Sequence, residues 1–347
     1  MKKGIIVIFL LCSIILPVNA AEFTAPVAPE SAQPYMPGSQ ETFAQGLWHI
    51  VKSAISAIEP ALAEAAGSCL SIIVIVVLLS IMKSLNKTSS LTMRLTGAVV
   101  VGVLLLEPVS SMISLGADTV RQLSDYSKLL LPVMTAALAA QGGTTTSAAL
   151  YTGTAFFDAL LTTVISRIVV PALYIYLSLC VANSALDQEL LKKLQGNVKW
   201  AMTWLMKWTL YIFTGYLSIT GVVSGAVDSS VLKAAKIGIS GAVPVVGGIL
   251  SDATETILVS AGLMKNAAGV YGIFAVISVC IGPFIRIGVQ YLLLKLTAAI
   301  TDTLDYKPVA SLVQDFSTGM GFVLAMTGTV CVLLLVSLVC FMKGIGI

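Results

Sequence analysis

The chain has 347 residues, of which 57% are hydrophobic and 11% are charged, and its formal net charge is +3. Soluble domains carry roughly 25% charged residues, so this composition excludes an ordinary soluble domain and indicates a protein embedded in a lipid bilayer. The small basic excess is what cytoplasmic loops of a membrane protein normally hold. It does not form the clustered basic face that a nucleic-acid-binding protein needs.

The N-terminal segment predicts export. Residues 1–20 combine a basic pair, Lys2 and Lys3, with an apolar stretch and a small-residue ending at Ala20, which is the pattern of a cleaved signal peptide. An uncleaved anchor is the alternative, but the short apolar stretch and Pro17 favour cleavage. Residues 21–44 then predict an extracytoplasmic linker, because prolines at this density prevent an α-helix.

Residues 45–128 predict one amphipathic helix and two membrane spans. Apolar residues recur at helical spacing over Leu47–Ile58, which is typical of a helix that lies at the membrane interface. The first span covers Ala65–Met82, and the second runs from about Met93 to Leu106.

The charges around these spans predict their orientation. Lys83, Lys87 and Arg94 follow the first span without an acidic residue among them, which predicts a cytoplasmic connection. The segment Asp118–Lys128 mixes both signs of charge and is expected to form a loop on the outer side.

Residues 129–227 predict a first membrane half. The polar stretch Gln141–Ser147 divides a charge-free run into two half-length segments, and Ile168–Leu186 is a clearer span. Residues 187–200 predict a basic amphipathic helix on the cytoplasmic surface. A stripe of tryptophans then predicts an interfacial belt that anchors a span at Trp208–Val227, with stacking of a ligand as the alternative.

Residues 228–347 predict a second membrane half. Its expected elements are spans at Asn266–Ile285 and at about Gly288–Ile300, an amphipathic helix at Val309–Phe316 and a final span at Phe316–Met342. The fold class expected for the whole chain is an all-α polytopic membrane protein with about six to eight transmembrane helices plus interfacial amphipathic helices.

The two halves also predict a parallel internal repeat. Pro132 and Pro244 are 112 residues apart, and Pro171 and Pro283 have the same offset. Duplicated halves are a common way to build membrane transport folds, with a functional site between them. Chance similarity between apolar segments is the alternative.

The inventory of reactive residues argues against an enzyme. His49 is the chain's single histidine, so neither a conventional zinc site nor a Ser-His-Asp triad can be assembled. Cys69, Cys180, Cys280, Cys331 and Cys340 all lie in apolar stretches and are expected to pack as small hydrophobic residues. We expect no metal and no cofactor.

Ionisable groups and glycine breaks within apolar sequence are the candidate functional residues, because charge is costly in a membrane. We predict that they line a pore or dock a partner: Gly241, Pro244, Gly247, Gly248, Asp252, Glu255, Lys265, Asn266, Arg286 and Lys295. The alternative for Asp252 and Glu255 is a solvated helix start in an outside loop. The alternative for Arg286 and Lys295 is snorkelling to the membrane interface.

Gly241–Gly272, which reads GAVPVVGGILSDATETILVSAGLMKNAAGVYG, resembles the most characteristic stretch of the stage III sporulation protein AE family. The runs CIGPFIRIGVQYLLLKLTAAITD at Cys280–Asp302 and LTTVISRIVVPALYIYLSLCVAN at Leu161–Asn183 are similar to the family as well. The resemblance implies a multi-pass protein of endospore-forming bacteria in the mother-cell membrane that surrounds the forespore. It brings no catalytic residues with it.

The resemblance also implies partners. They are other stage III sporulation proteins of the same operon, including a cytoplasmic ATPase and a ring-forming membrane protein, and the forespore partner protein SpoIIQ. Together they would make a channel-like complex that sustains forespore development and late transcription.

Three functions remain open from the sequence. The first is a non-enzymatic subunit of that intercellular complex. The alternative is a stand-alone secondary transporter for a small solute, which would use the duplicated halves with Asp252, Glu255 and Arg286. An enzyme is the third, and the residue inventory argues against it.

Overall fold

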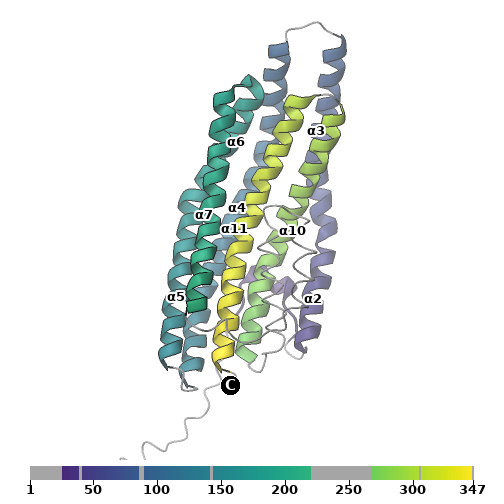
Figure 1. Cartoon of the computed structure of the whole chain (residues 1–347). Helices are drawn as coiled ribbons and strands as arrows, with labels where there is room; N and C mark the ends of the chain where they lie inside the picture. Colours follow the sequence, from purple (N-terminus) through teal and green to yellow (C-terminus); the bar gives the residue numbers. More distant parts are fainter. Residues whose placement is uncertain are drawn as a thin grey trace, which may run out of the picture.

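The computed structural model of the chain describes residues 26–38, 41–85, 90–140, 144–219, 267–304 and 306–345, and every regular element within them is a helix (Figure 1). In chain order the elements are η1 (Glu30–Tyr35), α2 (Phe43–Ser56), α3 (Ile58–Leu85), α4 (Ser90–Ala140), α5 (Thr144–Val164), the π-helical turn η2 (Ile165–Val169), α6 (Val170–Leu186), α7 (Glu189–Ile219), α10 (Ala267–Thr303) and α11 (Lys307–Ile345). The all-α prediction is therefore confirmed for this part of the chain.

The long helices run alternately in opposite directions along one elongated bundle (Figure 1). The last residues of α3, α6 and α10 and the first residues of α4, α7 and α11 gather at one end, which we call the turn end. Side chains tie the turn end together. The Ser184 hydroxyl donates to the Pro308 carbonyl at 2.7 Å, and the Tyr306 hydroxyl donates to the Met93 carbonyl at 2.7 Å.

Helix α11 forms the centre of the bundle. It packs against α10, α4, α6, α5 and α7. Of the most apolar 18-residue stretch in Lys307–Met342, 89% is buried, compared with 28% for the corresponding stretch in Phe43–Met82, the segment that includes α3. A helix that is apolar on all sides is stable only where protein or lipid surrounds it. Protein surrounds α11, whereas α3 leaves much of its apolar surface uncovered.

Five helical segments are long and apolar enough to cross a membrane, with mean hydropathies from 2.0 to 2.6. Their outer faces carry large exposed aliphatic side chains, among them Leu70 and Val74 on α3 and Val99 and Val103 on α4. Contiguous apolar surface of this kind is unfavourable in water but favourable in hydrocarbon. The described helices are therefore consistent with a membrane protein, and these five segments are the candidate spans.

Helix α4 is longer than one membrane crossing requires. Its 51 residues correspond to about 76 Å at a rise of 1.5 Å per residue, whereas the hydrocarbon layer is about 30 Å thick. Its second half exposes two ion pairs, Asp118–Arg121 at 3.0 Å and Asp125–Lys128 at 2.7 Å. The outside loop expected at Asp118–Lys128 is therefore wrong as a loop. Mixed charge correctly indicated exposure to water, but it does not distinguish a loop from a helix face.

Three pairs of separately predicted segments are single helices in the structure. Helix α7 joins the expected amphipathic helix at residues 187–200 to the segment that follows it. Helix α10 runs through Pro283 and so joins the two spans expected on either side of it. Helix α11 joins the amphipathic helix expected at Val309–Phe316 to the final span. The apolar residues of Val309–Phe316 face the bundle core and not the membrane interface. Periodicity revealed the apolar face but not whether lipid or a neighbouring helix covers it. Helix α10 tolerates its proline because neighbouring helices can compensate for the missing backbone donor.

The expected N-terminal linker is docked on the bundle where it is described. Prolines do exclude an α-helix there, but residues 30–35 form the 3₁₀ turn η1, which packs against α10. The Ala28 amide donates to the Tyr271 hydroxyl at 3.3 Å, and the Phe43 ring stacks on Phe274 with centroids 5.3 Å apart. A Cβ on Gly46 would lie 2.6 Å from the Phe274 ring, so this approach requires glycine.

Candidate functional site

Eight of the ten predicted site residues lie outside the described residues. They are Gly241, Pro244, Gly247, Gly248, Asp252, Glu255, Lys265 and Asn266, so their role as a pore lining or docking surface stays a prediction. Arg286 and Lys295 lie on α10, and both are exposed. Nine residues separate them, which places them on opposite faces of the helix. The Lys295 ammonium lies 5.7 Å from the Tyr291 ring centroid, a cation–π distance.

A polar cluster that the sequence reasoning missed lies where α6, α7 and α11 meet. Its members are Tyr176 on α6, Gln195 on α7 and Asp315 on α11, and the tyrosine hydroxyl and the glutamine amide face the carboxyl group. Tyr176 is fully buried and Gln195 nearly so. We call these three residues the three-helix cluster.

The three-helix cluster places one half-buried carboxyl group beside two buried polar side chains. The closest cations are Lys199 and Lys192 of α7, whose exposed side chains extend toward the surface. Moving a carboxyl group out of water costs several kcal/mol unless hydrogen bonds or an opposite charge compensate. Asp315 therefore depends on its two polar neighbours and on these lysines, and in return it fixes the relative positions of α6, α7 and α11.

A sequence signal for Asp315 existed. It is the acid that immediately precedes the charge-free run of the last span, and a lone acid at such a boundary is a candidate by the same rule that singled out Asp252. Asp158 was missed in the same way, because it ends the charge-free run that begins at Leu129. The structure buries Asp158 on α5, where the Ser124 hydroxyl of α4 donates to it at 2.9 Å.

A second polar group closes the turn end. The Arg94 guanidinium lies 3.2 Å from the Asp187 carboxylate, beside the Tyr306 ring. Burial raises the pKa of the Tyr306 phenol, and the positive charge of Arg94 acts in the opposite direction. A Cβ on Gly97 would lie 2.9 Å from the Tyr306 hydroxyl oxygen, so glycine lets the ring approach α4. This arrangement connects α4 to the α6–α7 and α10–α11 turns.

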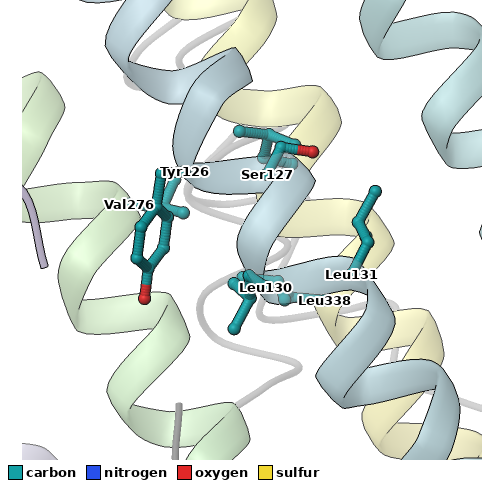
Figure 2. A pocket seen from close by; sticks show the side chains of 7 residues that line it. Tyr126, Ser127, Leu130, Leu131, Val276 and Leu338 are labelled. Atoms are coloured by element: carbon teal, nitrogen blue, oxygen red, sulfur yellow. The ribbon is translucent and has the colours of Figure 1, made fainter. Parts of the chain in front are cut away.

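A small cavity lies between α4, α10 and α11, with a volume of about 10 Å³ (Figure 2). Tyr126, Ser127 and aliphatic side chains from the three helices line it, and its lining surface is apolar. Figure 2 shows the Tyr126 ring beside α10 and the Ser127 hydroxyl directed away from that ring. The cavity is far smaller than a typical ligand pocket of about 300–1,000 Å³.

The described residues contain no group of three or more His, Cys, Asp or Glu side chains that could hold a metal ion. The thiols of Cys280 on α10 and Cys331 on α11 contact each other, and neither forms a disulfide. The His49 Nδ1 atom on α2 lies 3.6 Å from the Glu41 carboxylate, just before the start of that helix.

Over the residues that the structure describes, the fold is a bundle of helices with five candidate membrane-spanning segments. The family model described as stage III sporulation protein AE matches residues 35–344, and the chain belongs to this family. It is 23% identical over 275 residues to the stage III sporulation protein AE of Bacillus subtilis (strain 168), covering 78% of this chain and 69% of that relative. No solved structure matches the chain.

Proposed function

We propose that this chain is a non-enzymatic, multi-pass membrane subunit of a channel-like, secretion-type complex between the mother cell and the forespore. In this proposal it acts in the mother-cell membrane that surrounds the forespore, and the complex is required for endospore development and late forespore gene expression. The observation that carries the proposal is the family match over residues 35–344. Membership of a sporulation family implies a role in sporulation.

The described structure supports a subunit more than an enzyme. Its polar groups, the three-helix cluster and the Arg94–Asp187 pair, connect helices to one another. Between α4, α10 and α11, in the part of the chain that the structure describes, the long helices enclose a small apolar cavity. We therefore propose that a path for solutes forms with partner chains or with the segment around Gly241–Gly248, which lies outside the described residues. The partners proposed are the ATPase and the ring-forming protein of the same operon, and SpoIIQ from the forespore.

Co-purification from sporulating cells tests this proposal. An epitope-tagged chain is solubilised in mild detergent, and the ring-forming protein and SpoIIQ are measured in the eluate. We expect both to co-purify with the wild-type chain, and we expect Gly248→Leu or Asp252→Lys to reduce recovery while the chain itself stays inserted. Asp302→Asn, at an exposed position of α10, is the matched control. Normal sporulation of a strain without the chain would contradict the proposal.

A secondary transporter for a small solute is a second candidate, favoured by one observation. Buried carboxyl groups in membrane segments are typical of ion-coupled pathways, and Asp158 is 3% exposed. Purified chain reconstituted alone in liposomes distinguishes the two functions. Solute movement coupled to an ion gradient without partners would favour the transporter, whereas the subunit proposal predicts none.

A further inference from the structure

Helix α5 carries a row of three oxygen atoms that have no hydrogen-bonding partner among the described residues. Thr154, Asp158 and Thr162 follow one another at intervals of four, so they share one helix face. Thr154 is fully buried and Asp158 is 3% exposed. The Thr154 hydroxyl, the Asp158 Oδ1 atom and the Thr162 hydroxyl are all unpaired within the described ranges.

The unpaired hydroxyls are unusual for this bundle. A buried helical threonine normally donates to the carbonyl four residues earlier. Thr119 on α4 makes that bond at 2.7 Å, Thr301 on α10 at 2.8 Å and Thr327 on α11 at 2.9 Å. Thr154 occupies an equally buried helical position without this bond. Its oxygen therefore remains available to another partner.

Helix α4 contributes two more oxygens to the same place. The Ser124 hydroxyl donates to Asp158 Oδ2 at 2.9 Å. The Ser127 hydroxyl, 2% exposed, lies beside the same carboxyl group, but it makes no hydrogen bond of ordinary geometry within the described part of the chain. Ser127 also lines the small cavity between α4, α10 and α11 (Figure 2). Asp158, Thr154, Ser124 and Ser127 are called the α4–α5 oxygen cluster.

The charge of Asp158 lacks a dedicated partner. The nearest charged groups are Lys128 and Asp125 of α4. These two residues pair with each other at 2.7 Å, and their side chains are 66% and 72% exposed. The lysine charge is thus largely neutralised by Asp125 and screened by solvent.

From this geometry we infer that the α4–α5 oxygen cluster binds a monovalent metal cation, Na⁺. Carboxylate and hydroxyl oxygens are ligands for hard cations, and a single positive charge neutralises one carboxylate, whereas a divalent ion would leave a net charge buried. The direct bond between Ser124 and Asp158 holds the oxygens of the two helices close together, which favours Na⁺ over the larger K⁺. The exposed pair Asp125–Lys128 marks the water-facing surface of α4 next to the cluster.

Thermal unfolding of the full-length chain in detergent tests the inference, with sodium chloride, potassium chloride and choline chloride compared at equal ionic strength. A ligand that binds only the folded state raises the midpoint temperature of unfolding. We expect saturating Na⁺ to raise the midpoint by about 5 °C over choline and K⁺ to raise it less. Equal midpoints in sodium and choline would overturn the inference and leave Asp158 as a neutral, protonated side chain.

Two pairs of variants assign the site. Asp158→Asn should abolish the sodium-dependent shift, and Asp302→Asn, at an exposed acid on α10, should retain it. If Asp158→Asn fails to fold, Thr154→Val provides a second measurement, because it removes one ligand and keeps the charge. We expect it to raise the sodium concentration for half-maximal stabilisation about tenfold, whereas Thr152→Val should not, since Thr152 is exposed and bonded to the Ala148 carbonyl at 2.9 Å. A sodium shift unchanged in Asp158→Asn or in Thr154→Val would overturn the assignment.

Discussion

The Arg94 guanidinium on α4 lies 3.2 Å from the carboxylate of Asp187, the residue that ends α6. Asp187 has a φ of 52°, and it is the one non-glycine residue in the described ranges with a positive φ. The same residue therefore stops one helix, turns the chain toward α7 and ties that turn to α4. Asparagine and aspartate tolerate this left-handed conformation better than other side chains.

Substitutions at Asp187 should separate the charge from the backbone conformation. Asp187→Asn keeps a residue that tolerates the left-handed conformation and removes the ion pair with Arg94. Because the Asp187 side chain is 76% exposed, we expect this change to cost less than about 1 kcal/mol. Asp187→Val also forces a β-branched residue into the left-handed region, which adds about 1–2 kcal/mol. Thermal unfolding in detergent measures the stability of both variants. An equal loss of stability in the two would show that the left-handed conformation at residue 187 is not required.

The close approach of α4 and α11 should depend on Gly116. A Cβ there would lie 2.5 Å from Val323 Cγ1 and 2.8 Å from Met326 Cε. We expect Gly116→Ala to destabilise the bundle by about 1–3 kcal/mol, because a well-packed contact must shift. Gly196 on α7 has open space at the same position, so Gly196→Ala should be neutral or stabilise the helix by up to about 1 kcal/mol. A reversed order in unfolding midpoints would contradict the packing of α4 on α11.

The contact between Cys280 and Cys331 offers a test of the α10–α11 packing with native residues. Mild oxidation of the detergent-solubilised chain should join these two thiols, since they already touch and a disulfide needs nearby Cα atoms. Tryptic cleavage at Arg286 and Lys295 separates the two cysteines, so mass spectrometry can identify the linked peptides. The Cys331→Ser variant should lose the link. Preferential linkage of Cys280 to Cys69 or Cys340 would contradict the described arrangement.

Loss of the Asp315 carboxyl group should weaken the junction of α6, α7 and α11. Asp315→Leu leaves the buried Gln195 amide without that partner, and an unsatisfied buried polar group costs about 1–3 kcal/mol. Asp315→Asn keeps a hydrogen-bonding group and should cost less. Asp302→Asn, at an exposed site, should change stability by no more than about 0.5 kcal/mol. If Asp315→Leu stabilised the chain, the three-helix cluster would have no structural role.

Sequence alone predicted the helical class and the existence of apolar segments, because composition and charge-free runs report directly on the surrounding medium. It did not predict helix lengths. Nothing in Asp118–Lys128 shows that α4 continues through it, since helix propensity and charge pairs at intervals of three suit both a solvated helix and a loop. The final number of membrane crossings and the internal repeat stay predictions.

The buried polar groups were harder to predict than the fold. Asp158 and Asp315 each stand at the edge of an apolar run, where a membrane protein also places ordinary solvated acids. Only the packing of α4 on α5, and of α6 and α7 on α11, distinguishes a buried carboxyl group from an exposed one. Arg286 and Lys295, which were predicted from the same rule, turned out to be exposed on α10.

The claim on which the rest depends is that lipid surrounds the first half of α4 and water surrounds its second half. Val103 and the Arg121 side chain are both 62% exposed in the bundle. Single cysteines at these two positions are therefore equally uncovered by protein, and a difference in their labelling reports whether lipid or water surrounds them. In a chain whose own cysteines are replaced by alanine, a membrane-impermeant maleimide should label Arg121→Cys and leave Val103→Cys unlabelled until detergent is added. Equal labelling of both positions in intact membranes would contradict the account.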